Sequence, residues 1–477
     1  MRWGRLASML LLALVAAGCG ADRDDDAGSD STDDAAATAD AGTGDDGEDG
    51  GTSGDTAGGD DDVDGDTAEA HADDDAGNAD AGNRADDRTE EAEVPTEVTA
   101  TVVSAVDGEP IAGVVVTSVG AVSDDDVDPI TTDADGAFTI EADLDQPLLI
   151  RLPTWLPVAV DPSELASGDT IELQPVVARG VRVSREVAAD GGRFDDLLDL
   201  IAPTTVNALV FDTKDETGQV LYRTDVAKAA ELGAVEALYR PDELLARADD
   251  AGLYPITRVV TFEDDLWSEG DAEAKLAGDW VDATDPVNWE YPLALAAEAC
   301  ALGFAEVQFD YVRYPAGRTA EVAADLVPRT PDERSAVIAA FLTEAGERLA
   351  PFGCGVSAAI FGIVMSSETD EGIGQTVEAI GPVVDALSPM LYPSHYGPGW
   401  LGFADPNDHP GPVIADALDD GLPRLAPDTQ MRPWIQAFYY NGAQIGAQIS
   451  EAESRGAGWL LWNASGNYRA DWLPVAP

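Results

Sequence analysis

The chain has 477 residues, of which 92 are acidic and 26 are basic, and its formal net charge is −66. This length predicts two or three domains with room for a large core. The strong negative charge excludes binding to a phosphate backbone, so no nucleic acid partner is expected. Only three of the residues are lysine, which also argues against a polybasic patch for membranes.

The first eighteen residues predict a signal for export. Arg2 and Arg5 precede an apolar run of twelve residues at 6–17. Twelve residues are too few to cross a bilayer core of about 30 Å, but they suit the apolar region of a secretory signal. The run ends in AAGC, which resembles the lipobox of bacterial lipoproteins. We expect Cys19 to carry lipid and to anchor the exported chain to the membrane of the bacterial cell envelope. Simple cleavage near Ala17, which leaves a free cysteine, is the alternative.

An acidic stretch follows at 19–94. Its residues 21–94 hold 28 acidic side chains and three arginines, with almost no large apolar residue. Such a composition cannot bury enough apolar surface to offset the entropy of the chain. We expect a disordered tether that its like charges keep extended. Residues 95–477 hold 64 acidic and 21 basic residues, so the folded part is acidic in its own right.

Short β-branched segments alternate with turns across 95–176. Residues 97–103 alternate in polarity, as expected of a strand with one buried face, and DG turns begin at Asp107 and Asp135. This rhythm predicts a small all-β sandwich of about seven strands. The stretches DGEPIAGVVV and TTDADGAFTI resemble carboxypeptidase-regulatory-like and transthyretin-like sandwiches. The resemblance implies a spacer or a weak binding module.

Apolar strands and helices alternate eight times from residue 177 to residue 477. The strands are near-continuous apolar runs, typical of a parallel sheet buried on both faces. They are predicted at 176–183, 207–214, 254–262, 306–312, 355–361, 384–392, 431–438 and 458–464. Helices are predicted between them at 194–201, 242–251, 286–302, 332–350 and 443–455. The size and rhythm predict an α/β fold of the (β/α)8 TIM barrel type. An open doubly wound sheet is the alternative, but no glycine-rich nucleotide loop follows an early strand.

Polar and aromatic residues gather where six of these strands end. In a barrel, the chemistry lies at the C-terminal ends of the strands. The alternation of strand residues places Gln308 and Asp310 on one face, and Val307 and Phe309 on the other. The apolar pair is expected to pack on helices, so Gln308 and Asp310 point inward. Because buried charges are costly unless paired or used, these strand ends predict a functional site.

The same segments resemble a known family. NALVFDTKDETG, GFAEVQFDYVRYP, LSPMLYPSHY, RPWIQAF and GWLLWNASGNY occur in the order found in the glycoside hydrolase family labelled DUF4015, over roughly 180–468. This resemblance implies a (β/α)8 barrel related to polysaccharide hydrolases. The chain departs from the family pattern at Ala359, where an aspartate is expected. That departure favours, as the alternative function, a catalytically inactive surface barrel that binds carbohydrate.

Hydrolysis of a glycosidic bond requires two carboxyl groups, one to protonate the leaving oxygen and one to attack or to activate water. Asp310 is the first candidate, because it stands at a strand end with Arg313 nearby. Asp212 is the expected second. Three further candidates for the second carboxyl are Glu263, Asp264 and Glu368. The sequence therefore predicts an envelope-anchored glycoside hydrolase that cleaves a polysaccharide or oligosaccharide.

Each catalytic candidate also has a structural alternative. Asp310 could form an ion pair with Arg258 or Arg432. Asp212 could likewise pair with Lys214 or Arg258. Side chains suited to bind hydroxyl groups or to stack on sugar rings are predicted to bind substrate. They are Lys214, Arg258, Gln308, Arg313, Tyr392, His395, Tyr396, Arg432, Trp434, Gln436, Trp462 and Asn463.

Three histidines and three cysteines offer no cluster with metal-ligand spacing, so no metal and no cofactor are expected. Cys300 and Cys354 are interpreted as buried free thiols, with a disulfide as the alternative. A serine hydrolase built on Ser394 and His395 is disfavoured, because adjacent residues do not readily form a nucleophile and base pair and no G-x-S-x-G motif is present. Metal-dependent deacetylation would need more histidines.

Overall fold

The computed structural model describes residues 96–118 and 129–476, which belong to one compact unit. The predicted signal at 1–18, the lipidation site Cys19 and the acidic tether lie outside the described residues. Within the part of the chain that the structure describes, none of the helices has the length and apolar character needed to cross a membrane.

The N-terminal β domain, residues 96–173, consists of two sheets. One has the strand order β4-β1-β7, and the other has the order β3-β2-β5-β6. The strands are β1 Thr96–Ser104, β2 Val115–Ser118, β3 Ile130–Thr131, β4 Ala137–Ala142, β5 Leu148–Arg151, β6 Val158–Val160 and β7 Asp169–Leu173. Alternate residues of β1 point into the core, where Val98, Ala100 and Val102 pack with Phe138 and Ile150. The alternation seen in the sequence is therefore the alternation of one buried face.

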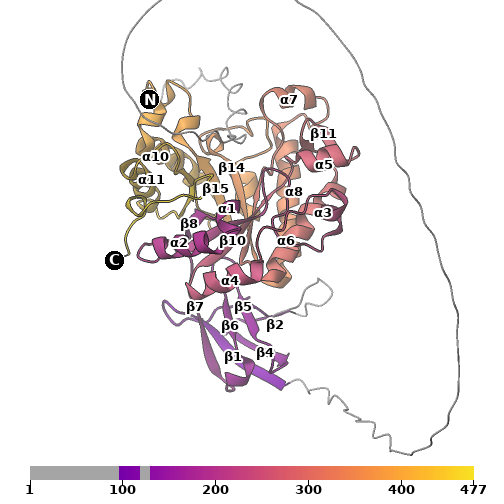
Figure 1. Cartoon of the computed structure of the whole chain (residues 1–477), viewed down its shortest axis with the longest axis vertical. Helices are drawn as coiled ribbons and strands as arrows, with labels where there is room; N and C mark the ends of the chain where they lie inside the picture. Colours follow the sequence, from indigo (N-terminus) through magenta and orange to yellow (C-terminus); the bar gives the residue numbers. More distant parts are fainter. Residues whose placement is uncertain (1–95, 119–128, 477) are drawn as a thin grey trace, which may run out of the picture. The chain divides into compact units, whose positions relative to one another are not determined.

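Eight parallel strands close into a barrel (Figure 1). They are β8 Arg179–Arg182, β9 Ala208–Lys214, β10 Tyr254–Val260, β13 Glu306–Asp310, β14 Gly355–Phe361, β15 Ala386–Leu391, the pair β16 Gln430–Met431 and β17 Trp434–Gln436, and β18 Trp459–Trp462. The ring closes because β14 pairs with β15. The seventh strand is split around Pro433, which has no N–H to donate to a ladder. The predicted (β/α)8 TIM barrel is confirmed.

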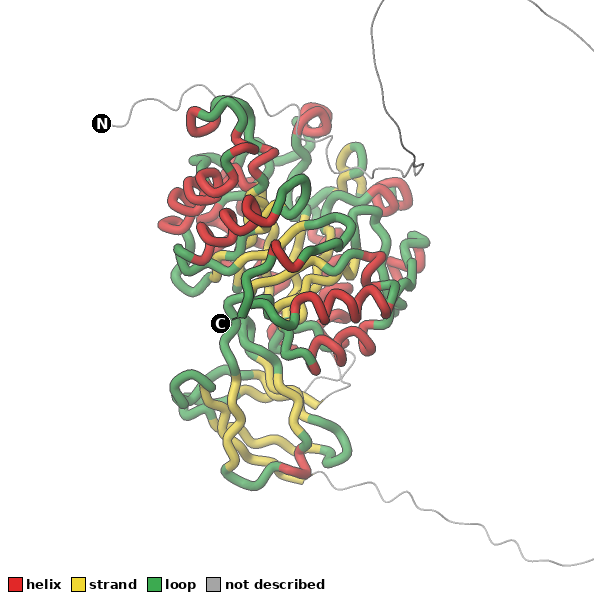
Figure 2. Tube along the Cα trace, turned by 60° about the vertical axis from the view of Figure 1, so that its left-hand side comes forward, coloured by secondary structure: helices red, strands yellow, loops and turns green. Residues whose placement is uncertain are grey.

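Helices surround the barrel, as Figure 2 shows. They are α1 Arg185–Ala188, α2 Gly191–Ile201, α3 Ala227–Glu231, α4 Pro241–Asp250, α5 Asp265–Gly270, α6 Glu290–Leu302, α7 Gly317–Ala323, α8 Pro331–Leu349, α9 Val377–Ile380, α10 Pro410–Gly421 and α11 Gly442–Glu453. Local chemistry sets their starts. In α8, Thr330 and Glu333 form a capping box around Pro331 in the first turn. A small hairpin, β11 Lys275–Ala277 and β12 Trp280–Val281, stands outside the barrel sheet.

The barrel strands bury both of their faces, but the two faces contact different groups. On β13, Val307 and Phe309 belong to the apolar layer between the sheet and the helices. Gln308 and Asp310, the alternate residues, point into the barrel, where they contact Trp434 and Arg258. The inward direction predicted from the alternation is therefore correct. It brings polar side chains from several strands into one interior.

The N-terminal ends of the barrel strands contact the β domain. The Arg151 guanidinium donates hydrogen bonds to the carbonyl oxygens of Cys300 (2.8 Å) and Phe304 (3.3 Å). The Thr154 N–H donates to the Tyr254 hydroxyl at the first residue of β10. Because these partners all lie where α6 ends or where a barrel strand begins, the β domain covers this end of the barrel, here called the closed end.

Cys300 and Cys354 form a disulfide, with an S–S distance of 2.03 Å. The interpretation of these residues as free thiols is wrong. Cys300 belongs to α6 and Cys354 directly precedes β14, and the two come together because both elements start or end at the closed end. The bridge closes a loop of 54 residues.

Candidate active site at the barrel mouth

An arginine joins two inward carboxylates where neighbouring strands end. Register places Arg258 of β10 opposite Asp212 of β9 and Gln308 of β13. Arg258 Nη1 lies 3.0 Å from Asp212 Oδ1, and Arg258 Nε lies 2.8 Å from Asp310 Oδ2. The two aspartate side chains are 0 % and 6 % exposed. Three consecutive strands thus build one charged cluster at the C-terminal ends of the strands, here called the mouth.

Arg182 and Glu216 complete this cluster. Arg182, at the end of β8, donates to Asp212 Oδ2 from both Nε (3.1 Å) and Nη2 (2.6 Å). Glu216 Oε1 accepts from Arg258 Nη2 at 3.1 Å, and its Oε2 lies 3.6 Å from Arg182. Neither residue is predicted from the sequence. Arg182 lies two residues after Gly180 on β8, so the alternation of strand residues would have turned both toward the interior of the barrel.

Both oxygens of Asp310 are occupied. Oδ2 accepts from Arg258, and Oδ1 accepts from the N–H of Tyr311 at 2.7 Å. Tyr311 has a φ of +51°, in the left-handed region that a tyrosine rarely adopts. Strained backbone of this kind persists where the surroundings fix it, and it clusters at functional sites. The Asp310 carboxylate is therefore held in one orientation at the mouth.

The two arginines set the charge of the neighbouring carboxyl groups. Burial raises the pKa of Asp212, while Arg182 and Arg258 oppose that shift. Burial also acts on Glu216, but Arg258 and Arg182 hold its pKa at about 2. Glu216 is therefore ionised at neutral pH. The cluster contains three carboxyl groups and two guanidinium groups, joined by ion pairs.

A further ion pair, of Arg313 with Glu263, lies beside this cluster. Arg313 follows β13, and its guanidinium carbon lies 4.4 Å from the ring centroids of both Trp280 and Phe361. Its Nη2 lies 3.5 Å from Glu263 Oε2. Glu263 follows β10 and its side chain is 37 % exposed. Burial raises the pKa of Glu263, the Arg313 charge opposes this, and the Asp310 charge adds to it.

Aromatic side chains follow two other strands at the mouth, although Tyr392 among them is buried, with 5 % of its surface exposed. The Trp462 ring at the end of β18 lies 4.3 Å from the Arg182 guanidinium carbon and 5.0 Å from that of Arg258. Tyr392 follows β15 and meets His395 edge-on, with ring centroids 5.2 Å apart. His395 is exposed. These residues, predicted to bind substrate, do lie at the C-terminal ends of their strands.

Four of the predicted binding residues, Lys214, Gln308, Arg432 and Trp434, are instead buried and used inside the protein. Lys214 is 1 % exposed, and its ammonium group lies 2.7 Å from Asp264 Oδ2. Gln308 is fully buried and accepts a hydrogen bond from Trp434 Nε1 at 2.8 Å. Arg432 binds Glu306, the first residue of β13, at the closed end. The alternation of strand residues predicts on which face of the sheet a side chain lies. It does not predict how far the side chain lies from the mouth along the barrel axis.

The remaining predicted residues connect loops. Gln436 accepts from the Ser394 N–H at 3.1 Å, and Asn463 donates to the Ala437 carbonyl at 2.8 Å. The Tyr396 hydroxyl is buried and has no hydrogen-bond partner among the described residues. Within residues 96–118 and 129–476, no group of three or more histidine, cysteine or acidic side chains is arranged to hold a metal ion.

A family model matches the barrel. Residues 180–468 match DUF4015, described as "Putative glycosyl hydrolase domain". The chain belongs to this family. The match spans the strands from β8 to β18 and so includes every residue of the charged cluster. The barrel is a glycosyl hydrolase domain, and it carries the mouth described above. A search of curated proteins gives no match.

Solved structures similar to the chain include three from bacteria. The glycoside hydrolase domain of PgaB (BpsB) from Bordetella bronchiseptica is 12% identical, with a TM-score of 0.47, over 61% of this chain and 95% of that one. The glycoside hydrolase domain of PelA from Pseudomonas aeruginosa is 14% identical, with a TM-score of 0.37, over 61% and 97%. A hypothetical protein from Ruminiclostridium thermocellum is 27% identical, with a TM-score of 0.33, over 37% and 96%.

The DUF4015 barrel of this chain carries an alanine where an aspartate is expected. Ala359 is fully buried on β14. Register pairs Ala358 with Phe309, so Ala359 stands beside Asp310 on the neighbouring strand. Its methyl group belongs to the apolar cluster inside the barrel, together with Trp434. The mouth therefore has no carboxyl group at this position next to Asp310.

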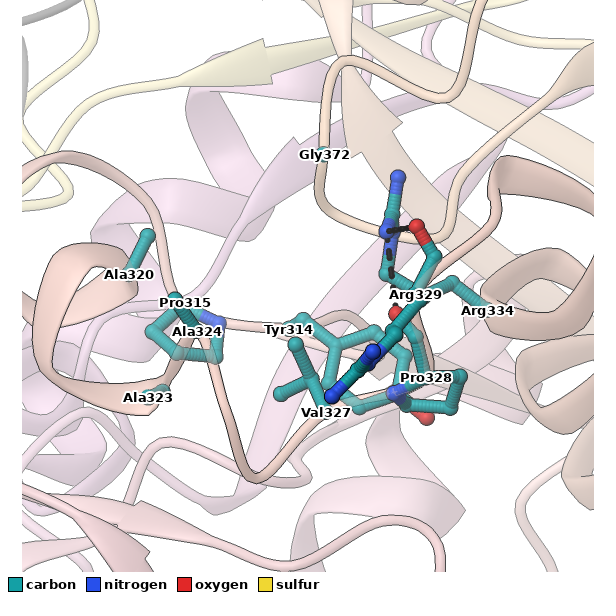
Figure 3. Close-up of a pocket in the computed structure, with 10 residues that line it drawn as sticks. All are labelled: Tyr314, Pro315, Ala320, Ala323, Ala324, Val327, Pro328, Arg329, Arg334 and Gly372. Carbon is teal, nitrogen blue, oxygen red and sulfur yellow. Dashed lines mark hydrogen bonds between the residues drawn. The ribbon is translucent and has the colours of Figure 1, made fainter.

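A pocket of about 330 Å³, whose lining Figure 3 draws, has no residue of the charged cluster in its wall. Its walls come from the loop after β13, from α7, from the start of α8 and from Gly372. The lining residues are Tyr314, Pro315, Ala320, Ala323, Ala324, Val327, Pro328, Arg329, Arg334 and Gly372. The Arg334 guanidinium donates to the carbonyl oxygens of Pro328 and Arg329. Asp212, Asp310 and Arg258 do not line it, so it is not the site of the carboxylate chemistry.

Proposed function

We propose that the barrel cleaves glycosidic bonds of a polysaccharide and that Asp310 is a catalytic carboxyl group. The observation that supports this most is the fixed orientation of Asp310 at the mouth, with Arg258 on one oxygen and the Tyr311 N–H on the other. Donors on both oxygens hold the carboxyl group in one direction, and a nucleophile or a general base must be positioned in this way. The family match gives the class of reaction.

Asp212 acts in this proposal together with Asp310. The two carboxylates share Arg258, and Arg182 occupies the other oxygen of Asp212. Because a guanidinium group binds each oxygen of Asp212, neither oxygen is open to a substrate. Asp212 therefore orients Arg258 and, through it, Asp310. An Asp212→Asn variant is expected to lose activity, and the double variant is expected to be little worse than the poorer single variant, because the two act as a unit.

The substrate is proposed to be a polysaccharide or oligosaccharide that meets aromatic and polar side chains at the mouth. Trp462, Tyr392 and His395 lie at the C-terminal ends of β18 and β15. Aromatic rings match the apolar C–H faces of pyranose rings. The arginines are committed to carboxylates, so their contribution is to fix the site.

We also propose that the chain is anchored to the cell envelope through lipid on Cys19, with the acidic stretch as the tether. The apolar run and the AAGC sequence support this proposal. A Cys19→Ser variant is expected to leave the membrane fraction and to appear in the soluble fraction. Continued association of this variant with membranes would rule out the lipid anchor.

The activity can be tested by digestion of a panel of polysaccharides with the full chain, with new reducing ends as the readout. Asp310→Asn is the matched control, because it keeps the shape of the side chain but cannot ionise. The proposal predicts cleavage of at least one polysaccharide by the wild type and little or none by the variant. Equal release of reducing ends by both proteins would refute the role of Asp310.

An inactive carbohydrate-binding barrel is the second candidate, and Ala359 is the observation that favours it. The site then holds a sugar without a carboxyl group beside Asp310. Binding isotherms with a polysaccharide, without product release over a long incubation, would support this function. In that case an Ala359→Asp variant that gains cleavage would identify the missing group.

A further inference from the structure

Four carboxyl groups lie at the mouth, and one of them differs from the other three. Asp212, Glu216 and Asp310 each have a cationic or N–H donor near both oxygens. Glu263 has one contact, from Arg313 to Oε2 at 3.5 Å. Its Oε1 accepts no hydrogen bond from the residues that the structure describes. Glu263 thus keeps an oxygen available for a ligand.

Glu263 follows the C-terminal end of β10, the strand next to the one that carries Asp310. Register places Val260 of β10 opposite Asp310, and Glu263 follows three residues later. The Thr261 and Phe262 amides between them bond to the carbonyl oxygens of Asp310 and Tyr311, so β10 continues alongside the β13 segment. The Glu263 side chain therefore reaches the mouth from the strand next to Asp310.

The surroundings fix the position of Glu263. Its backbone pairs with Trp280 of the β11–β12 hairpin. The Arg313 guanidinium carbon lies 4.4 Å from the ring centroids of both Trp280 and Phe361. A single contact at 3.5 Å is weak compared with the contacts of Arg258 to Asp310.

The charges around Glu263 favour its protonated form. Asp310 from β13 and Asp279 from the β11–β12 hairpin are both negative, and burial disfavours a charge at this position. Arg313 is the positive group that opposes them. Glu216, by contrast, stays ionised between two arginines. A carboxyl group whose environment favours the protonated form is suited to act as a general acid.

We propose that Glu263 is the proton donor of the site and that Asp310 is the second carboxyl group of the pair, which rests on the proposed glycoside hydrolase function. Glu263 gives its proton to the glycosidic oxygen while the bond from that oxygen to the anomeric carbon breaks and its electron pair moves to the oxygen. Water then gives a hydroxyl group to the anomeric carbon while Asp310 takes its other proton, and transfer of this proton to Glu263 restores the starting state. No oxidant or cofactor enters this balance.

The leaving group distinguishes a proton donor from other roles. A 2,4-dinitrophenyl group departs as an anion without help, whereas a 4-methylumbelliferyl group or a sugar requires protonation. The experiment measures kcat for matched aryl glycosides of both kinds and for the polysaccharide that the wild type cleaves. Glu263→Gln is expected to lower the rate by about 10²–10⁴-fold on the polysaccharide and to change the dinitrophenyl rate little. Asp265→Asn is the control, because Asp265 is exposed and lies outside the cluster.

The pH profile gives a second readout. The wild type is expected to lose activity as the pH rises and Glu263 ionises, and the Gln variant is expected to lack this limb. Glu263→Asp, which keeps an acid but shortens its reach, is expected to fall between the two. Equal losses on both leaving groups, or none, in a folded Gln variant would overturn the role of Glu263 alone. A wild type that cleaves no glycoside would overturn the proposed function with it.

Discussion

The two ends of the barrel each bury an arginine against carboxylates, but they differ in what surrounds the pair. At the closed end, Arg432 and Glu306 are 1 % and 0 % exposed. At the mouth, Arg258 is equally buried but extends to Glu216, which is 29 % exposed. Both arrangements consist of charged side chains inside a barrel. Buried charge alone therefore does not distinguish the two ends. Contact with solvent, and a carboxylate oxygen that is open to a ligand, distinguish the mouth from the closed end.

The closed end is expected to be the more sensitive to loss of a charge. Glu306→Gln leaves Arg432 buried without a counter-charge, which is expected to lower the free energy of unfolding by about 3–5 kcal/mol. Unfolding in denaturant measures this. Glu216→Gln at the mouth is the matched comparison and is expected to cost less, because water reaches Glu216. A larger loss for Glu216→Gln would reverse the comparison.

Asp385, which lies at the closed end, predicts that the free energy of unfolding depends on pH. Burial raises its pKa to about 6, and its Oδ2 accepts from the Val356 N–H. The folded state therefore holds the proton more tightly than the unfolded state, whose pKa is near the ordinary 3.8. The resulting stability is present at about pH 4 and is lost as the pH rises through about 6, by about 2–3 kcal/mol.

Asp385→Asn separates this group from the general charge of the protein. The variant keeps an acceptor for Val356 but does not titrate. Its free energy of unfolding is expected to fall less between pH 4 and 7 than that of the wild type, and thermal or denaturant unfolding at several pH values measures the difference. Parallel curves for the two proteins would show that another group dominates.

The contact between the β domain and the barrel predicts a smaller effect. Arg151 donates to two carbonyl oxygens at the end of α6. Arg151→Ala removes these bonds and is expected to lower the free energy of unfolding by about 1–2 kcal/mol. Arg240→Ala, which removes an exposed pair, is the control and is expected to change stability little. A barrel fragment that begins at residue 177 is expected to be less stable than the full chain for the same reason.

The sequence predicts direction better than depth. Alternation on β13 correctly turns Gln308 and Asp310 inward, because a strand exposes alternate residues to opposite faces. It cannot say that Gln308 is sealed in a middle layer or that Arg432 lies at the closed end. Those facts depend on the register of eight strands, which no single strand encodes.

The sequence predicts only some of the contacts within the charged cluster. Arg258 was expected near both aspartates, and it does bind them. Arg182 lies on the first strand, directly beside the second strand, which carries its partner Asp212. Glu216 lies in a loop, where alternation gives no direction. The contacts of Glu216 with Arg258 and Arg182 therefore depend on how the loop after β9 folds.

The rate of a folded Asp310→Asn variant tests most directly the claim that the mouth is the catalytic end. Asparagine keeps one acceptor, so either Arg258 or the Tyr311 N–H loses a partner, and a modest fall in melting temperature is expected. On the polysaccharide that the wild type cleaves, the account predicts a rate lower by about 10²–10⁴-fold, with a smaller change in substrate affinity. Full activity in the folded variant would contradict it.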